Sequence, residues 1–195
     1  MPYEPPPDLA GLSLAQIAGL IEERKLPPVG EWAPVETGDS HMRIAADGRW
    51  FHEGGEIRRP AMVRAFASLL TRDAKGRHWL VTPRQKLSIE VDDAAFIATD
   101  VRRDGEALAF RLNTDDLILA GPANPIRAAG SRETPAIYVI ARNGAEARLN
   151  RSTYLQLVEI ALDADGADPE RPEVSSMGES FSLVPVAGPG RVTPR

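Results

Sequence analysis

The chain has 195 residues, of which 43% are hydrophobic and 26% charged, and its formal net charge is −5. It contains no cysteine, which excludes disulfides, thiolate metal sites and a cysteine nucleophile, and its scattered Lys and Arg residues lack the basic stripe of a nucleic-acid binder. No apolar stretch approaches the length of a membrane span. A chain of this length forms one larger domain or two small ones.

The beginning of the chain predicts an arm and a short helix. Residues 1–11 are rich in Pro, and Ser13 with Gln16 forms a capping box for a helix over residues 14–24. A helix this short is marginal alone, so its apolar face needs a surface to pack against. This surface is either a sheet of the same chain or, if the protein is a homodimer, residues 14–21 of a second copy. Because no basic segment precedes an apolar run, we expect a cytoplasmic protein.

A first hairpin is predicted around Asp47-Gly48. This dipeptide lies between two strand-like runs and supplies the positive φ angles that a two-residue turn requires. Pairing across the turn sets Arg43 opposite His52, with His41 one pair further along the same sheet face.

A helix is expected next. Gly54-Gly55 permits a second reversal, and Pro60 suits the first turn of a helix because its missing N–H has no partner there. The helix then presents one apolar face, made by Val63, Phe66, Leu69 and Leu70.

The remaining chain predicts a β-rich section and a second helix. Asp104-Gly105 and Asn143-Gly144 each lie between two strand-like runs and indicate hairpins. A helix is expected over residues 151–162, whereas residues 121–135 and 163–180 are typical of loops or linkers. Further strands are expected over residues 78–82, 86–91, 117–120 and 181–184, and disorder over residues 187–195.

The two halves are alike over one short stretch. Residues 57–66 align without gaps with residues 149–158, and each combines the end of a hairpin, an Arg and an apolar helix. The alignment fits two related α+β units. Because a hairpin followed by a helix is common, chance similarity stays open as the alternative.

One cluster of candidate residues contains both histidines of the first hairpin. Asp39, His41 and His52 would join a carboxylate to two imidazoles on a shared sheet face, as a metal site or acid–base catalysis requires. In the predicted register Arg43 lies between the imidazoles, which favours an anion over a cation. A polar, solvated face is the plain alternative.

A second candidate is the polar run that ends a predicted strand. Asn113, Thr114, Asp115 and Asp116 offer oxygen ligands for a hard cation or polar groups for another ligand, without the spacing of an EF-hand. Hydrogen bonding within a turn explains the same residues more simply.

The third candidate is a set of cations. Arg84 and Lys86 lie in one short loop, and with Arg43, Arg58, Arg59 and Arg127 they would line an anion pocket if the fold brings them together; scattered surface charge is the alternative. Of this set, Arg43, Lys86 and Arg127 are the residues on which the expected function depends. The chain has no Gly-rich phosphate loop, nucleophile elbow or HExxH motif, which lowers the expectation of an enzyme.

These residues resemble the bacterial family called domain of unknown function 1285 (DUF1285). The resemblance spans residues 32–184 and is carried by Gly38-Asp39-Ser40-His41-Met42-Arg43-Ile44, Asp47-Gly48, Trp50-Phe51, Leu80-Val81-Thr82-Pro83 with Lys86, and Asn113 with Asp115-Asp116. It implies an α+β fold of two small domains, an N-terminal β-roll-like domain and a C-terminal α+β roll, each with hairpins and a packed helix. It implies no activity, cofactor or catalytic residue, and His41 stands where the family motif is associated with an acidic residue.

The expected organisation has four parts. These are an arm and helix (residues 1–28), a β-rich domain (29–92), an α+β domain (93–186) and a disordered tail (187–195). The resemblance places the domain boundary near residues 91–94.

The expected function is a cytoplasmic binding or regulatory module that holds a small anionic ligand or a protein partner in the cleft between its domains. The alternative is a metal-assisted or acid–base hydrolytic enzyme that uses Asp39, His41 and His52, or Asp115 and Asp116. No cofactor, metal or catalytic residue is assigned, and neither nucleic acid nor a membrane is an expected partner. The candidate ligand-binding residues are Asp39, His41, Arg43, His52, Lys86, Asn113, Asp115, Asp116 and Arg127.

Overall fold

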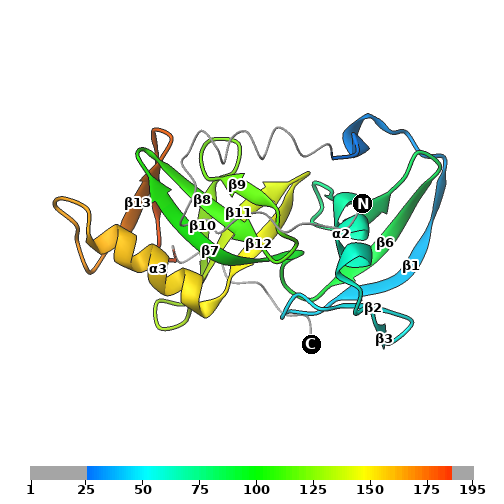
Figure 1. Ribbon diagram of the computed structural model, residues 1–195, viewed down its shortest axis with the longest axis horizontal. Coiled ribbons are helices and arrows are strands. Elements are labelled where there is room, and N and C mark those ends of the chain that lie inside the picture. The colour runs from blue at the N-terminus through cyan, green and yellow to red at the C-terminus, as the bar shows by residue number, and fades with distance from the viewer. Residues whose placement is uncertain (1–25, 186–195) are drawn as a thin grey trace.

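The computed structural model describes residues 26–185, and shows two domains side by side along the long axis of the molecule (Figure 1). The predicted helix over residues 14–24 and the predicted disorder over residues 187–195 lie outside the described residues. No helix in the described part is both long and apolar enough to cross a membrane.

The N-terminal domain is a six-stranded sheet with one helix on it. Its strands lie in the order β3-β2-β1-β6-β5-β4. In chain order the elements are η2 (Val29–Glu31), β1 (Glu36–Ile44), β2 (Trp50–His52), β3 (Gly55–Glu56), α2 (Pro60–Ser68), β4 (Leu70–Arg72), β5 (His78–Val81) and β6 (Gln85–Val91).

The C-terminal domain contains a second six-stranded sheet, in the order β10-β11-β12-β7-β8-β9, and a two-stranded sheet. Helix α3 packs mainly on β7, at the end of the molecule away from the N-terminal domain (Figure 1). The elements are β7 (Phe96–Asp104), β8 (Ala107–Leu112), β9 (Leu117–Leu119), β10 (Ile126–Gly130), β11 (Pro135–Arg142), β12 (Ala145–Leu149), α3 (Arg151–Leu162), β13 (Glu173–Ser176) and β14 (Glu179–Ser182).

The two large sheets share one topology. Each consists of two three-stranded antiparallel meanders, and the first strand of the first meander pairs in parallel with the last strand of the second, as β1 with β6 and β7 with β12. The helices differ in position, because α2 joins the two meanders whereas α3 follows them. The predicted alignment of residues 57–66 with 149–158 therefore matches segments that are not equivalent in the sheets.

The predicted pairing of the first hairpin is wrong by one residue. Arg43 lies opposite Phe51, and Met42 lies opposite His52. Because paired residues share a sheet face and successive residues alternate, Arg43 and His52 lie on opposite faces.

The length of the turn explains this shift. The N–H of Ala45 donates to the carbonyl of Arg49 at 2.9 Å, and the N–H of Gly48 donates to the carbonyl of Ala45 at 2.8 Å. The loop therefore has three residues, with Gly48 at a φ of 84° in the left-handed position typical of such loops. Asp-Gly is compatible with both loop lengths, so the dipeptide alone does not fix the register.

Other predictions were confirmed where the signal was local. Pro60 begins α2, Asn143-Gly144 forms a two-residue turn with positive φ at both positions, and α3 has the predicted bounds. The predicted loop over residues 121–135 instead contains β10, and the predicted linker over residues 163–180 contains β13. These strands are short and are defined by partners distant in sequence, which local composition does not reveal.

A single cluster of buried apolar side chains runs through both domains. It joins Ile44 and Trp50 of the first sheet to Phe96 and Phe110 of the second. Trp50 also stacks on Phe66 of α2, with the ring centroids 6.4 Å apart. The chain is thus a two-domain, mixed α+β protein built mostly of strands, as predicted at that level; the finer description of the sheets as rolls stays a prediction.

Candidate functional site

Three of the predicted residues come together in a hollow on the N-terminal sheet, which we call the β1 hollow. Its volume is about 650 Å³. It is lined by Asp39, His41, Met42, Arg43, Phe51, Gly54, Ser88, Ile89 and Glu90. His52, which lies on the opposite sheet face from Arg43 in the first hairpin, does not line it.

A bulge in β1 shapes this hollow. Asp39 pairs with Ser88 and Arg43 pairs with Glu90, so three residues of β1 face one residue of β6. His41, in the middle, has a φ of 53°, and its N–H donates to Oδ1 of Asp39 at 2.8 Å. Bulges of this kind redirect a side chain, and here His41 is exposed.

The charge in the β1 hollow does not favour an anion. Nε and Nη2 of Arg43 donate to the two carboxylate oxygens of Asp92, at 2.8 and 2.5 Å. This pairing lowers the pKa of Asp92 and raises the pKa of Arg43. The remaining charged groups in the lining are Asp39 and Glu90. Within the described residues, no group of three or more His, Asp or Glu side chains could hold a metal ion.

The other predicted cations have partners elsewhere. Lys86 lies over the ring of Trp79, with Nζ 4.7 Å from the centroid. Arg127 makes a two-pronged contact with Glu146, at 2.5 and 2.9 Å, and lies over the ring of Tyr138. The fold does not bring Arg43, Lys86 and Arg127 into one pocket.

Arg127 belongs to a polar network on β10, β11 and β12. The hydroxyl of Tyr138 donates to Asp93 at 2.7 Å, and Arg148 contacts the other oxygen of Asp93 at 2.7 Å. Burial and the hydrogen bond to Asp93 raise the pKa of Tyr138 to about 12. Glu146 is linked further to Arg72 of the N-terminal domain at 3.8 Å, so the network reaches across the domain boundary.

The predicted polar run lies in the β8–β9 turn, against the N-terminal domain. Asp115 has a φ of 62° and contacts Arg64 of α2 at 3.7 Å. Asp116 is buried and contacts Arg142 at 3.0 Å. Both carboxylates thus have arginine partners, and this arrangement differs from the oxygen-rich site of a hard cation.

Asn113 of the same run leads to a different site. It forms one wall of a pocket between the domains, which we call the inter-domain pocket, with a volume of about 280 Å³. The pocket is lined by Gly48, Arg49, Trp50, Glu56, Ile57, Arg58, Pro60, Val63, Arg64 and Asn113.

Three arginines line the inter-domain pocket, each from a different segment of the N-terminal domain. Arg49 precedes β2, Arg58 lies between β3 and α2, and Arg64 is in α2. Arg49 and Arg64 were not among the predicted site residues. Arg58 and Arg59 come directly before Pro60, the first residue of α2, in a sequence without a Ser, Thr, Asp or Asn cap, and this was the signal that could have indicated the site.

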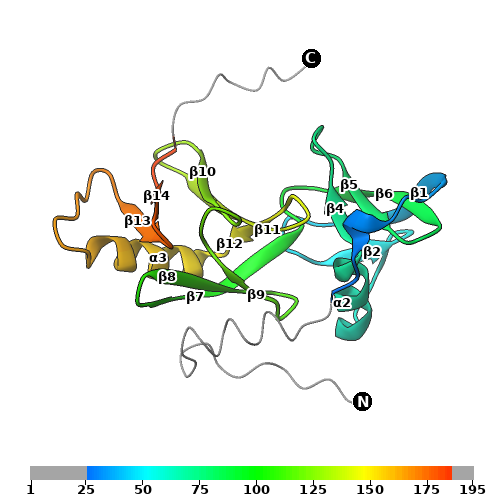
Figure 2. The ribbon, with the colours of Figure 1, turned by 90° about the horizontal axis from the view of Figure 1, so that it is seen from above.

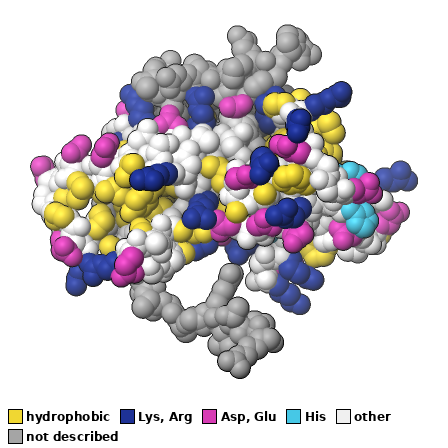
Figure 3. Space-filling view, turned by 90° about the horizontal axis from the view of Figure 1, so that it is seen from below, with side chains coloured by type: hydrophobic (Ala, Val, Ile, Leu, Met, Phe, Trp, Pro, Cys, Tyr) yellow, Lys and Arg dark blue, Asp and Glu magenta, His cyan; other side chains and the backbone are white. Residues whose placement is uncertain are grey.

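Each of these arginines also has an acidic neighbour. Arg49 contacts Asp47 at 2.7 Å, and Arg58 contacts Glu56 at 3.2 Å. The Arg58 side chain is 83% exposed, so its ion pair with Glu56 is easily exchanged for another partner. Figure 3 shows acidic and basic side chains interspersed over one face of the molecule rather than a patch of one sign.

Fold and pocket together define a two-domain α+β protein, mostly of strands, with an arginine-lined pocket where its domains meet. The chain belongs to the DUF1285 family, as the resemblance indicated. The model of the N-terminal domain of this family (domain of unknown function) matches residues 27–94, and the model of its C-terminal domain (protein of unknown function) matches residues 95–183.

Two solved structures are similar to this chain. A DUF1285 family protein from Silicibacter pomeroyi DSS-3 is 40% identical, with a TM-score of 0.73, over 89% of this chain and 96% of the other. A DUF1285 family protein from Shewanella baltica OS155 is 21% identical, with a TM-score of 0.50, over 60% of this chain and 90% of the other, and shows the fold alone. No curated protein matches the chain. The comparisons assign no function, and the hydrolase alternative gains no support from them.

Proposed function

We propose that this protein is a binding module for a small anionic ligand, and that the ligand occupies the inter-domain pocket. One observation carries the proposal: three arginines from three segments of the N-terminal domain line a pocket that Asn113 of the C-terminal domain also lines. Pockets at domain junctions with a few convergent polar groups are common ligand sites.

The balance of charge in the pocket supports an anion. The lining has three cations, Arg49, Arg58 and Arg64, and one acid, Glu56. The other acidic neighbours, Asp47 and Asp115, are not part of the lining. Guanidinium groups bind carboxylates and phosphates through paired N–H donors, and such charge-assisted bonds are about twice as strong as neutral ones.

The proposal keeps the expected ligand class and place, and changes most of the residues. Asn113 is retained from the candidate ligand-binding residues and Arg58 from the predicted cations, whereas Arg43, Lys86 and Arg127 lie outside this pocket and contact other side chains. Asp39 and His41 lie in the separate β1 hollow. A protein partner, a homodimer and a cytoplasmic location stay predictions.

Thermal unfolding of the dialysed protein against a panel of anions tests the proposal. A ligand at about a hundredfold excess over its Kd adds about 2.7 kcal/mol to the free energy of unfolding and raises the midpoint. We expect phosphate or carboxylate compounds to raise it. Arg58→Ala should weaken binding about tenfold or more, because it removes a charge-assisted hydrogen bond of about 1.5–3 kcal/mol.

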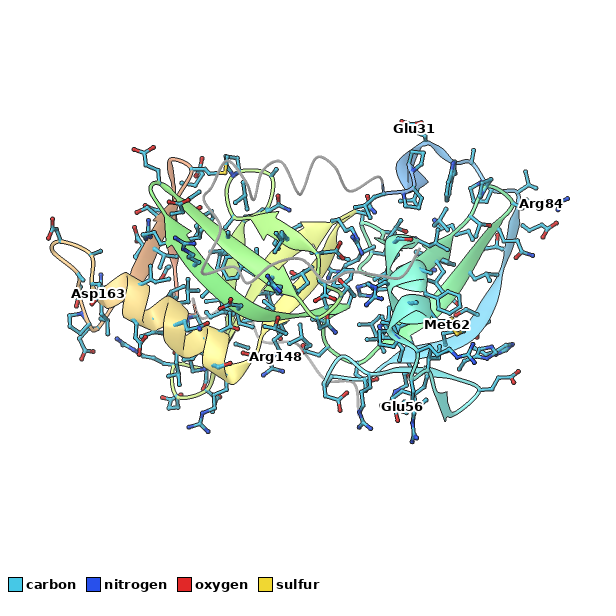
Figure 4. The ribbon with its side chains drawn as sticks, viewed as in Figure 1. Glu31, Glu56, Met62, Arg84, Arg148 and Asp163 are labelled. Carbon is cyan, nitrogen blue, oxygen red and sulfur yellow. The ribbon has the colours of Figure 1, made fainter. Side chains whose placement is uncertain are left out.

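Arg84→Ala is the matched control. Arg84 lies in the β5–β6 turn, on the opposite side of the N-terminal domain from Glu56 of the pocket (Figure 4). It should bind anions as tightly as the wild type. A midpoint that rises equally in the Arg58 and Arg84 variants would place the anion elsewhere, and a rise with divalent cations alone would return the hydrolase to consideration.

A further inference from the structure

One face of the C-terminal sheet is buried although no described element lies on it. We infer that the helix predicted over residues 14–24, which lies outside the described residues, docks on this face and so connects the start of the chain to the C-terminal domain. The inference is separate from the anion-binding function. It depends on the register of β7, β8 and β9, on burial, and on the place where the described chain begins.

The register of the three strands separates the two faces of the sheet. Paired residues share a face, and successive residues alternate between faces. One face is turned to the main cluster of buried side chains, which contains Phe110 of β8 and Leu157 of α3. The opposite face consists of the cross-strand rows Asp100–Arg111–Leu117, Arg102–Ala109–Leu119 and Asp104–Ala107. We call Ala107, Ala109, Leu117 and Leu119 the apolar strip.

Most of the apolar strip is shielded from solvent. Ala107, Ala109 and Leu117 are 2%, 1% and 9% exposed. None of the three belongs to the main cluster of buried side chains or to the small cluster around Trp79. Leu117 lies on β9, an edge strand of the sheet, so its burial indicates that another segment packs on it.

The described elements lie on the other side of these strands. Leu157 and Ala161 of α3 belong to the main cluster. Seen from above, α3 and β13 lie on one side of β7 and β8, and no described helix or strand lies on the other side (Figure 2). The cover must therefore come from a part of the chain outside the described residues, or from a second molecule.

The apolar strip has a shape that suits a helix. Its two alanines lie on the middle strand, and Ala109 has the longer side chains of Arg102 and Leu119 beside it on the neighbouring strands. Small side chains between longer ones leave a shallow trough, into which large side chains of a helix can pack. The predicted helix has one apolar face, made by Leu14, Ile17, Leu20 and Ile21.

The start of the described chain limits where this helix can lie. The first described residue is Leu26, two residues after the end of the predicted helix, so that end lies within about 7 Å of Leu26. In Figures 1 and 2 the described chain begins, in blue, at the junction of the domains. The β8–β9 turn reaches the same junction, where Asp115 contacts Arg64 of α2 at 3.7 Å.

The lengths of the two partners also agree. A helix over residues 14–24 is about 16 Å long. The part of β8 from Ala107 to Arg111 is about 14 Å long. A helix that starts from the junction can therefore cover the whole strip without a long linker.

The exposed face of α2 is the competing place for the helix. Ala61, Met62 and Ala65 are exposed there, also near the junction. Met62 is 41% exposed, however, whereas the strip is buried. This difference favours the strip as the surface that the helix covers.

Cross-linking of the full chain tests the inference directly. The chain has no cysteine, so two introduced thiols are the only ones that a short bismaleimide can join. Leu119→Cys is combined in turn with Leu14→Cys, Ile17→Cys and Ile21→Cys, and we expect at least one pair to link within a single chain. Leu119→Cys with Ala15→Cys is the control, because residue 15 lies on the opposite side of the predicted helix from its apolar face.

Every other pattern of links would overturn the inference. Ile17→Cys that links to Ala65→Cys in place of Leu119→Cys would put the helix on α2. Products of doubled mass would make a second copy the cover. Equal linking from residues 15 and 17, or no link from any position, would show that the helix does not dock on the strip.

The rate of thiol labelling gives a second measurement. Iodoacetamide should modify Leu119→Cys at least fivefold faster when Ile17→Asp is added, because the new charge releases the apolar face of the helix from the strip. Ala15→Asp introduces the same charge on the other side of the helix and should leave the rate unchanged. Equal rates in all three chains would contradict the docking.

Discussion

Gly48 is the residue through which the β1–β2 turn contacts the second domain. A Cβ atom at this position would lie 2.8 Å from Nδ2 of Asn113 and 2.8 Å from Cγ1 of Ile97. The backbone there has a φ of 84°, which residues with a side chain rarely adopt. Because Gly48 and Asn113 both line the inter-domain pocket, this close approach also sets the shape of the site.

Gly48→Ala should lower the free energy of unfolding by more than the cost of backbone strain alone. The strained φ costs about 1–3 kcal/mol, and the contact with Asn113 adds to it. Gly54→Ala is the matched control, because Gly54 has a φ of 81° and nothing within 4 Å of its missing Cβ. Urea unfolding measures both variants, and an equal loss in the two would show that the domain contact contributes nothing.

At the level of elements, strands β10, β11 and β12 present a charged face that links the domains. Glu146 is its centre, since it contacts Arg127 and, more distantly, Arg72. Burial of Glu146 is the largest single effect and disfavours its charged form. The hydrogen bonding to Arg127 and the attraction of Arg127, Arg72 and His78 together outweigh burial and lower the pKa of Glu146 below its ordinary value of 4.5.

The sign of the resulting pH dependence follows from proton binding. The unfolded chain takes up a proton on Glu146 at a higher pH than the folded chain. The stabilisation by ionised Glu146 is therefore fully present above its ordinary pKa, and it is lost as the pH falls through the pKa of Glu146 in the folded protein. Glu146→Gln should lose about 1–3 kcal/mol at neutral pH and show a weaker acid dependence than the wild type.

Urea titrations from about pH 7 to pH 3 measure this difference. Glu170→Gln is the control, since Glu170 forms an ion pair with Arg132 but its side chain is 85% exposed. Glu170→Gln should change the free energy of unfolding very little. Parallel pH profiles for the wild type and Glu146→Gln would contradict the assigned role of the Arg127–Glu146 pair.

At the scale of the whole molecule, Arg142 connects the two domains through a hydrogen bond. Its side chain is 12% exposed, contacts Asp116 at 3.0 Å and donates to the carbonyl of Ala67 at 3.0 Å. Ala67 lies in the last turn of α2, where the helix dipole favours a cation. The β11–β12 hairpin thus reaches from the second domain to the end of α2, as the view from above also shows (Figure 2).

Arg142→Met should cost about 3–5 kcal/mol, because it leaves the buried carboxylate of Asp116 without its guanidinium partner. The double variant with Asp116→Asn should lose less than the sum of the two single variants. Arg132→Met, at an exposed ion pair, is the control. Additive losses in the urea unfolding of the single and double variants would rule out the coupling between Arg142 and Asp116.

The sequence by itself determined the features that depend on neighbouring residues. Helix α3 follows from its apolar spacing, the start of α2 from Pro60, and the β11–β12 turn from Asn143-Gly144, because each signal acts within a few residues. The family resemblance and the two-domain α+β organisation were likewise available from residue types in order.

Only the tertiary structure decided the register of the first hairpin, the existence of β10 and the composition of the candidate site. The register depends on a three-residue loop whose Gly48 packs against the other domain, and β10 is defined by its pairing with β11. The inter-domain pocket joins Arg49, Arg64 and Asn113, which are distant in sequence, so only the packing of the two sheets brings their side chains together.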